Sequence, residues 1–338
     1  MKKIILLLLS ALMVSNALAQ KYSVSKSISV TGTEGWDYLA VDEPAQHLFV
    51  SHGSVVNVID LKSEKMIATI PDTKGVHGIA IANDLDKAFI TDGKDNAVTV
   101  VNLKTFQLIE KIAIAGSRPD AVLYDAFSKK VFVYNAKTND ATVLDAITNK
   151  IVGTIPLDGK PEFSVTNNKG LIYVNIEDKN QIKTIDTVTL KVTQTRSIAP
   201  GDEPSGLAID LVNNLLFSVC SNKMMVVVNA INGKIIQTVP IGDGCDGVAF
   251  DAKKNLIFSS NGEGSITVVK ENSKNSFTVL ENVKTQRGAR TITLNKTTGQ
   301  LYLPTASFGE ATHPNAENAR PRPAILPDSF KILVVSSM

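Results

Sequence analysis

The feature that most constrains this fold is a repeat of four short β-branched runs separated by turn residues. In one copy the runs lie at 78–81, 89–91, 97–101 and 107–114, and Gly, Asp and Asn bound them, as is typical of strands. Equivalent positions recur every 40 to 44 residues along most of the chain. A period of this size with four strands per copy predicts the blades of a β-propeller.

Seven copies align on their first strand, so we predict an all-β, seven-bladed β-propeller with four-stranded blades. The innermost strands are expected at 38–42, 78–82, 121–125, 163–167, 206–210, 247–251 and 291–295. Five third strands close on an Asp or Asn whose side chain can bond its own backbone two residues on: Asp60, Asn102, Asp145, Asp186 and Asn229.

The seventh copy lacks a fourth strand, whereas the alternating segment 21–30 belongs to no copy. We expect 21–30 to pair outside 331–335 and close the ring, because closure removes an unpaired edge. Residues 20–338 would then form a single domain.

Three linker motifs and one strand pair connect the chain to a known family. Residues 89–102 resemble the YVTN-type repeat, and its inter-blade linker resembles Gly116-Ser117-Arg118-Pro119, Lys160-Pro161 and Glu203-Pro204. Over residues 28–338 the chain thus resembles the YVTN-type repeat propellers, the YncE-like exported propellers. The resemblance implies a seven-bladed exported propeller without an assigned reaction. A long insert in the seventh copy and a first copy without the linker Pro depart from the pattern.

Residues 1–19 have the composition of a secretory signal peptide. Lys2 and Lys3 precede an apolar run at 4–14, and Ala17-Leu18-Ala19 fits a cleavage site. The alternative is a retained membrane anchor, for which the run is short. We expect cleavage after Ala19, a periplasmic or secreted protein, and no later membrane span.

The charge balance limits the class of binding partner, and the two cysteines limit the disulfide pairing. The chain has 35 Lys and Arg against 33 Asp and Glu, and loss of Lys2 and Lys3 leaves 33 of each. A neutral chain argues against nucleic-acid binding through a basic surface, and we expect a monomer. Cys220 and Cys245 should lie at the same end of adjacent blades, either as a disulfide or as buried free thiols.

Residues 306–329 form the one irregular segment, a proline-containing insert in the last blade. Its length exceeds that of an ordinary hairpin loop, and such loops are usually functional or disordered. Because it joins a second to a third strand, it should leave from the same end of the ring as the residues that precede the innermost strands.

Standard cofactor and nucleophile motifs are absent, so the catalytic residues remain unknown and the candidate site comes from topology. The ring should gather the residues that precede the innermost strands at one channel mouth. We expect a ligand to bind there, with the insert folded over it. The ligand-binding candidates are Asp37, His77, Asp120, Glu162, Asp246 and Arg290, with Trp36 beside them and His313, Arg320 and Arg322 from the insert.

Each of these residues also has a second interpretation. A divalent metal, Ca²⁺-like or a transition ion, could bind to Asp37, His77, Asp120, Glu162 and Asp246, or the carboxylates could stay hydrated. Arg290 could bind an anion or pair with Asp246 or Asp37. Trp36 could stack on a ligand or pack between the first and last blades. As a general base, His77 would need a partner such as Asp120.

Three functions remain open at this point. The first is an exported module that presents its channel mouth to a small molecule, peptide or protein. The second is a metal-dependent hydrolase or lyase, lactonase-like, that uses the carboxylates. The third is a scaffold for an electron-transfer partner, since the fold resembles WD40-like and quinoprotein-like propellers.

Overall fold

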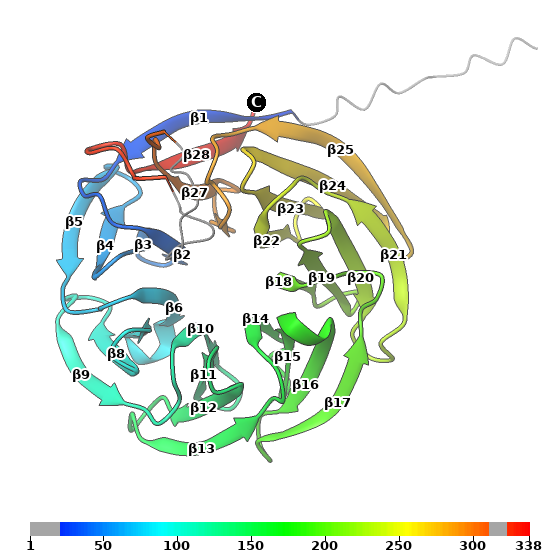
Figure 1. Ribbon diagram of the computed structural model, residues 1–338, viewed down its shortest axis with the longest axis horizontal. Coiled ribbons are helices and arrows are strands. Elements are labelled where there is room, and N and C mark those ends of the chain that lie inside the picture. The colour runs from blue at the N-terminus through cyan, green and yellow to red at the C-terminus, as the bar shows by residue number, and fades with distance from the viewer. Residues whose placement is uncertain (1–20, 311–322) are drawn as a thin grey trace, which may run out of the picture.

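The computed structural model describes residues 21–310 and 323–338, which form a ring of seven four-stranded antiparallel sheets (Figure 1). Each sheet is one blade, with its first strand innermost. The signal-peptide prediction for 1–19 lies outside the described residues. Within the described ranges no helix has the length and apolarity needed to cross a membrane.

Six blades take their four strands consecutively from the sequence. Blade 1 consists of β2 (Trp36–Asp42), β3 (His47–His52), β4 (Val55–Asp60) and β5 (Lys65–Ile70). Blade 2 consists of β6 (Val76–Ala82), β7 (Lys87–Asp92), β8 (Ala97–Asn102) and β9 (Leu108–Ala113). Blade 3 consists of β10 (Pro119–Asp125), β11 (Lys130–Asn135), β12 (Asp140–Asp145) and β13 (Ile151–Pro156). Blade 4 consists of β14 (Pro161–Thr166), β15 (Leu171–Ile176), β16 (Gln181–Asp186) and β17 (Lys191–Ser197). Blade 5 consists of β18 (Pro204–Asp210), β19 (Leu215–Cys220), β20 (Met224–Asn229) and β21 (Ile235–Pro240). Blade 6 consists of β22 (Cys245–Asp251), β23 (Leu256–Asn261), β24 (Ser265–Ser273) and β25 (Ser276–Lys284). Two short 3₁₀ helices, η1 (Asn83–Leu85) and η2 (Glu177–Lys179), lie between strands.

The seventh blade joins the two ends of the described chain. Its order is β26 (Thr293–Leu294), β27 (Leu301–Thr305), β28 (Lys331–Ser337) and β1 (Tyr22–Ser29). The predicted closure is therefore confirmed, since β1 pairs antiparallel with β28 from Tyr22 opposite Ser337 to Ser29 opposite Lys331. The predicted innermost strand at 291–295 is wrong in extent, because only Thr293 and Leu294 pair with β27.

The hydrophobic core lies between neighbouring blades rather than in one centre. In six blades the third residue of the second strand is aromatic, and five of these side chains are fully buried: Phe49, Phe89, Phe132, Phe217 and Phe258. Phe258 of blade 6, for example, packs in one cluster with Leu301 and Leu303 of blade 7. Each blade thus depends on its neighbours for burial, which is the general property of repeat folds.

The predicted Asx turns are also present. Asn102 Oδ1 accepts hydrogen bonds from the backbone N–H groups of Lys104 and Thr105, both at 2.9 Å. The equivalent bonds form at Asp60, Asp145, Asp186 and Asn229. These side chains fix the tight turns that lead into the outermost strands.

Cys220 and Cys245 are buried free thiols in adjacent blades. Cys220 ends β19 and Cys245 begins β22, and Cys245 Sγ lies 3.1 Å from the carbonyl oxygen of Cys220. The predicted placement at one end of neighbouring blades is correct. Burial raises the pKa of each thiol to about 12, so both remain protonated at neutral pH.

We expect both thiols to react with a thiol reagent only after unfolding, because the reactive thiolate is suppressed and access is blocked in the native chain. Titration with a chromogenic disulfide reagent at pH 8, without reductant, should give no thiols in the native protein and two in denaturant. A count of zero in denaturant would show a disulfide instead.

The closure strand can be tested at Tyr22, which attaches blade 7 to blade 6. Its ring is 2% exposed and meets Phe258 edge-on with 5.0 Å between ring centroids. Tyr22→Ala should lower the free energy of unfolding by about 3 kcal/mol, the usual loss for a buried aromatic side chain. Val24→Ala on the same strand, where Val24 is 37% exposed, should change it by about 0.5 kcal/mol or less. Equal effects in chemical denaturation would contradict the packing role of β1.

Candidate site at the channel mouth

The candidate residues occupy one equivalent position around the ring. The sequence pattern predicted them just before the innermost strands, and this detail is wrong. In six blades the residue is the second of its strand: Asp37, His77, Asp120, Glu162, Ser205 and Asp246. Arg290 lies three residues before β26.

A β-bulge marks this position. In blade 1, Trp36 pairs with His52 and Leu39 with Val50, so Asp37 and Tyr38 together oppose one residue. The same irregularity occurs in β6, β10, β14 and β18, and a related one in β22. A β-bulge changes the direction in which side chains point. Here the bulges leave the mouth residues outside the regular strand pairing, so that their side chains point toward the ring axis.

Hydrogen bonds between blades hold the backbone at the same level. The carbonyl oxygen of Asp37 accepts a bond from Thr291 Oγ1 at 2.6 Å, and that of Asp120 accepts one from Thr91 Oγ1 at 2.5 Å. Ser260 Oγ donates to the carbonyl oxygen of Arg290 at 2.5 Å. Each of these bonds comes from a neighbouring blade, so the ring itself sets the spacing of the site.

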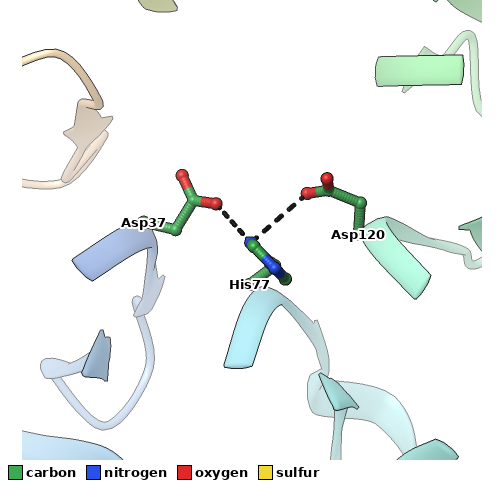
Figure 2. A group of neighbouring side chains, drawn as sticks. All are labelled: Asp37, His77 and Asp120. Carbon is green, nitrogen blue, oxygen red and sulfur yellow. Dashed lines mark hydrogen bonds and ion pairs between the residues drawn. The ribbon is translucent and has the colours of Figure 1, made fainter. Parts of the chain in front are cut away.

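His77 lies between two carboxylates of the neighbouring blades, as Figure 2 shows. Its Nδ1 is 2.6 Å from Asp37 Oδ2 and 3.6 Å from Asp120 Oδ1. Asp37 is therefore the hydrogen-bond partner, whereas the sequence analysis named Asp120. One ligand atom from each of the three side chains lies within 4.8 Å of the others.

Arg290 extends this cluster across the junction of the last and first blades. Its Nε is 2.7 Å from Asp246 Oδ2, and one terminal nitrogen is 3.1 Å from Asp37 Oδ1. Of the two interpretations of Arg290, the structure shows the ion pair, with both expected partners. Asp246, Arg290, Asp37, His77 and Asp120 thus form one connected row over blades 6, 7, 1, 2 and 3.

Glu162 pairs with a cation that the sequence analysis did not include. Lys160 Nζ lies 2.8 Å from Glu162 Oε1 and also pairs with Glu177. The separation of Lys160 and Glu162 by two positions was the sequence signal for this ion pair, because the side chains of residues i and i+2 in an extended segment point to the same side.

The carboxylates carry more negative charge than their partners neutralise. Burial raises the pKa of Asp120 to about 6; the charges of Asp37 and Asp246 add to this, and that of His77 opposes it. Burial and then the charge of Asp120 raise the pKa of Glu162, and burial raises that of Asp246 against the pull of Arg290. Burial opposes protonation of His77, but its contacts with Asp37 and Asp120 prevail and raise its pKa.

Two aromatic rings meet beneath the carboxylates. Tyr38 of blade 1 and Phe163 of blade 4 directly follow Asp37 and Glu162, and their ring centroids are 5.4 Å apart. Burial and the charges of four carboxylates, of which Glu162 contributes most, raise the pKa of Tyr38 well above 10. The hydroxyl therefore stays protonated, and the aromatic pair forms the floor of the mouth. No pattern in the sequence indicated this floor.

A cavity of about 350 Å³ lies at the rim, between the mouth and the base of the insert. Its lining includes Trp36, Arg290, Phe308 and Ile325. Trp36 stacks on Phe330 at 5.3 Å and lies 6.0 Å from Phe308, so it packs the first blade against the last. Of the insert residues proposed as ligand contacts, His313, Arg320 and Arg322 lie outside the described residues.

Protonation of the mouth should stabilise the fold. A carboxyl whose folded pKa is raised binds its proton more tightly in the folded chain, so stability falls as pH rises from about 4 to about 6. His77, with its raised pKa, acts in the same direction above pH 6.5. At pH 7.5 the free energy of unfolding of Asp120→Asn should therefore be about 1–2 kcal/mol higher than that of the unchanged chain. It should also depend less on pH.

Denaturant titrations at pH 4.5, 6 and 7.5 would measure this, with the exposed Asp72→Asn as the control. A variant that is destabilised equally at all three values would show that the Asp120 carboxylate is well satisfied when charged.

Comparisons with known proteins agree with this architecture. No model of a known protein family matches the chain. Over 150 residues it is 29% identical to an uncharacterized protein named YncE from Salmonella typhi, and equally to YncE of Salmonella typhimurium. Each alignment spans 42% of this chain and 42% of the relative, so less than half of either protein is matched.

Solved structures match over most of the ring. A chain of hydrazine synthase from Kuenenia stuttgartiensis aligns with a TM-score of 0.72 at 15% identity, over 81% of this chain and 93% of its own. The RRP9 WD40 repeats align with a TM-score of 0.78 at 8% identity, over 94% and 100%. At such identities the likeness concerns the fold alone. The chain is thus a seven-bladed β-propeller that is similar, over less than half of its length, to the YncE proteins.

Proposed function

We propose that the chain is a binding module whose channel mouth takes a cationic group of a small molecule or of a protein partner. The observation that carries this proposal is the excess of carboxylates over cations at the mouth. Asp37, Asp120, Glu162 and Asp246 converge there, against Arg290, His77 and a Lys160 that is shared with Glu177. An ammonium or guanidinium group would offset the burial and the mutual repulsion that raise the pKa values of Asp120, Glu162 and Asp246.

The geometry suits an extended cationic side chain. Asp120 is 9% exposed, and its carboxylate accepts no hydrogen bond from the described residues; its nearest cationic partner is His77, at 3.6 Å. Such a buried carboxylate favours a charged donor. The rim cavity beside Arg290 offers apolar surface for the part of the ligand that carries the charge.

Calorimetric titration with spermidine and with tetralysine at low salt tests the proposal. The paired change Asp120→Asn with Glu162→Gln should weaken binding at least tenfold. The control pair Asp72→Asn with Glu203→Gln removes the same charge from exposed turns that also precede innermost strands, and should change binding less than twofold. Equal losses in both pairs, or no binding of either probe, would refute a specific cationic site.

Binding should also depend on pH. Protonation of Asp120, with its pKa of about 6, and of His77 removes negative charge and adds positive charge. We therefore expect affinity for spermidine to rise from pH 5 to pH 7.5, and the rise to shrink in Asp120→Asn. An affinity that is constant over this range would place the cation elsewhere.

A divalent metal is the second candidate, favoured by the approach of Asp37, His77 and Asp120 within 4.8 Å. Two carboxylates and an imidazole suit a first-row transition ion better than Ca²⁺, which prefers oxygen ligands. A metal there would supply the Lewis acid that the alternative hydrolase or lyase function requires. Metal analysis of purified protein and of His77→Ala separates the two: stoichiometric Mn²⁺ or Zn²⁺ that the variant loses would favour the metal.

Export belongs to the same proposal and is supported by the signal-like pattern of residues 1–19. In a periplasmic or extracellular setting the mouth would meet exported partners or small cations. Fractionation of cells that express the full chain tests export. The N-terminal residue of the exported protein tests cleavage, because cleavage after Ala19 would leave Gln20 at the N-terminus.

A further inference from the structure

A second cavity lies on the other side of the aromatic floor. It has a volume of about 650 Å³ and is lined by the later residues of the inner strands of blades 3 to 6. Phe163 borders this cavity and also contacts Tyr38 beneath the carboxylates. The two sites are therefore separated by a single layer of aromatic side chains.

The walls of this cavity are mainly apolar. They include Leu123, Val165, Ile209 and Phe250, which are only partly buried although they face the interior of the ring. A smaller cavity of about 290 Å³ shares Leu123, Phe163 and Lys296 and continues toward blades 1 and 2. Apolar walls around a volume of this size are typical of small-molecule sites, and a ligand that covered them would gain hydrophobic stabilisation.

The rim carries lysines without acidic partners. Lys253 and Lys296 border the cavity and are exposed, and neither ammonium pairs with a carboxylate of the described chain. Lys253 Nζ instead donates to the carbonyl oxygen of Lys296 at 2.6 Å. This brings the two side chains to the same edge.

The acidic residues of the same rim are already satisfied. Asp210 Oδ1 accepts the backbone N–H of Val212 at 2.8 Å, and Asp251 Oδ1 accepts that of Lys253 at 2.9 Å. Both carboxylates are buried in their own turns. The unpaired charges on the rim of this cavity are therefore those of Lys253 and Lys296, while Glu43 at the adjoining smaller cavity accepts the backbone N–H of Lys296 at 3.2 Å.

We infer that this cavity is a second binding site, for an anionic amphiphile such as a medium-chain carboxylate. The chain would lie against Leu123, Ile209 and Phe250, and the carboxylate would face Lys253 and Lys296. This inference goes beyond the proposed function, because it concerns the opposite end of the channel and the opposite ligand charge.

Calorimetry on the full chain with three probes tests each part of the inference. Decanoate carries both features, decyltrimethylammonium has the same chain with the opposite charge, and butyrate has the charge with little chain. We expect decanoate to bind with one-to-one stoichiometry and at least tenfold more tightly than either of the others. Equal binding of both ten-carbon probes, or no saturable binding of decanoate, would overturn the inference.

Variants then locate the site. Lys253→Gln with Lys296→Gln should weaken decanoate binding at least fivefold. The control pair Lys191→Gln with Lys234→Gln changes two exposed lysines, one at the start of β17 and one just before β21, also without acidic partners in the described residues, and should leave it within twofold. Asp120→Asn with Glu162→Gln should leave decanoate binding unchanged, which separates this test from that of the mouth. Equal effects of the two lysine pairs would overturn the assignment to this cavity.

Discussion

The pairing of β1 with β28 is the interaction on which the rest of the structure depends. Arg290 belongs to blade 7 and Asp37 to blade 1, so their ion pair at 3.1 Å exists only when these blades meet. The stacking of Trp36 on Phe330 crosses the same junction. Because β1 also buries Tyr22 against blade 6 and Ile28 against blade 1, one strand fixes the closed circumference. The spacing of all mouth residues follows from that circumference.

Most of the fold could be predicted because the strand pattern repeats at a regular interval in the sequence. Regular β-branched runs and Asx turns set the blades, and the missing fourth strand indicated the closure. The exact place of the mouth residues could not be predicted, because a β-bulge is a property of the hydrogen-bond register between two strands. The sequence shows Asp37 and His77 at equivalent positions, yet it does not show that two residues there oppose one.

Proximity across the ring was the other limit. Tyr38 and Phe163 are 125 positions apart, and their contact depends on the diameter of a seven-bladed ring and on side-chain length. The same limit applies to residues that end the second strands. His52, Asp92, Asn135 and Asn261 lie at the same end of the ring as the mouth residues, but they are buried inside their blades. Asn135, for instance, donates to Asp140 and Thr142 of its own blade. Topology gives the end of the ring, whereas side-chain packing decides which polar groups reach its axis.

The channel is electrostatically polar along its axis, and this follows from where each inner strand begins and ends. The early positions carry Asp37, Asp120, Glu162 and Asp246, while the later ones carry apolar side chains with Lys253 and Lys296 beyond them. The aromatic pair of Tyr38 and Phe163 lies between the two ends, and no ion pair among the described residues joins the carboxylates of the mouth to Lys253 or Lys296. A ligand with a single charge could not satisfy both ends, since the charge that one end attracts is repelled by the other. The two ends of the ring therefore differ in chemistry, which predicts opposite ligand preferences on the two sides of the aromatic pair.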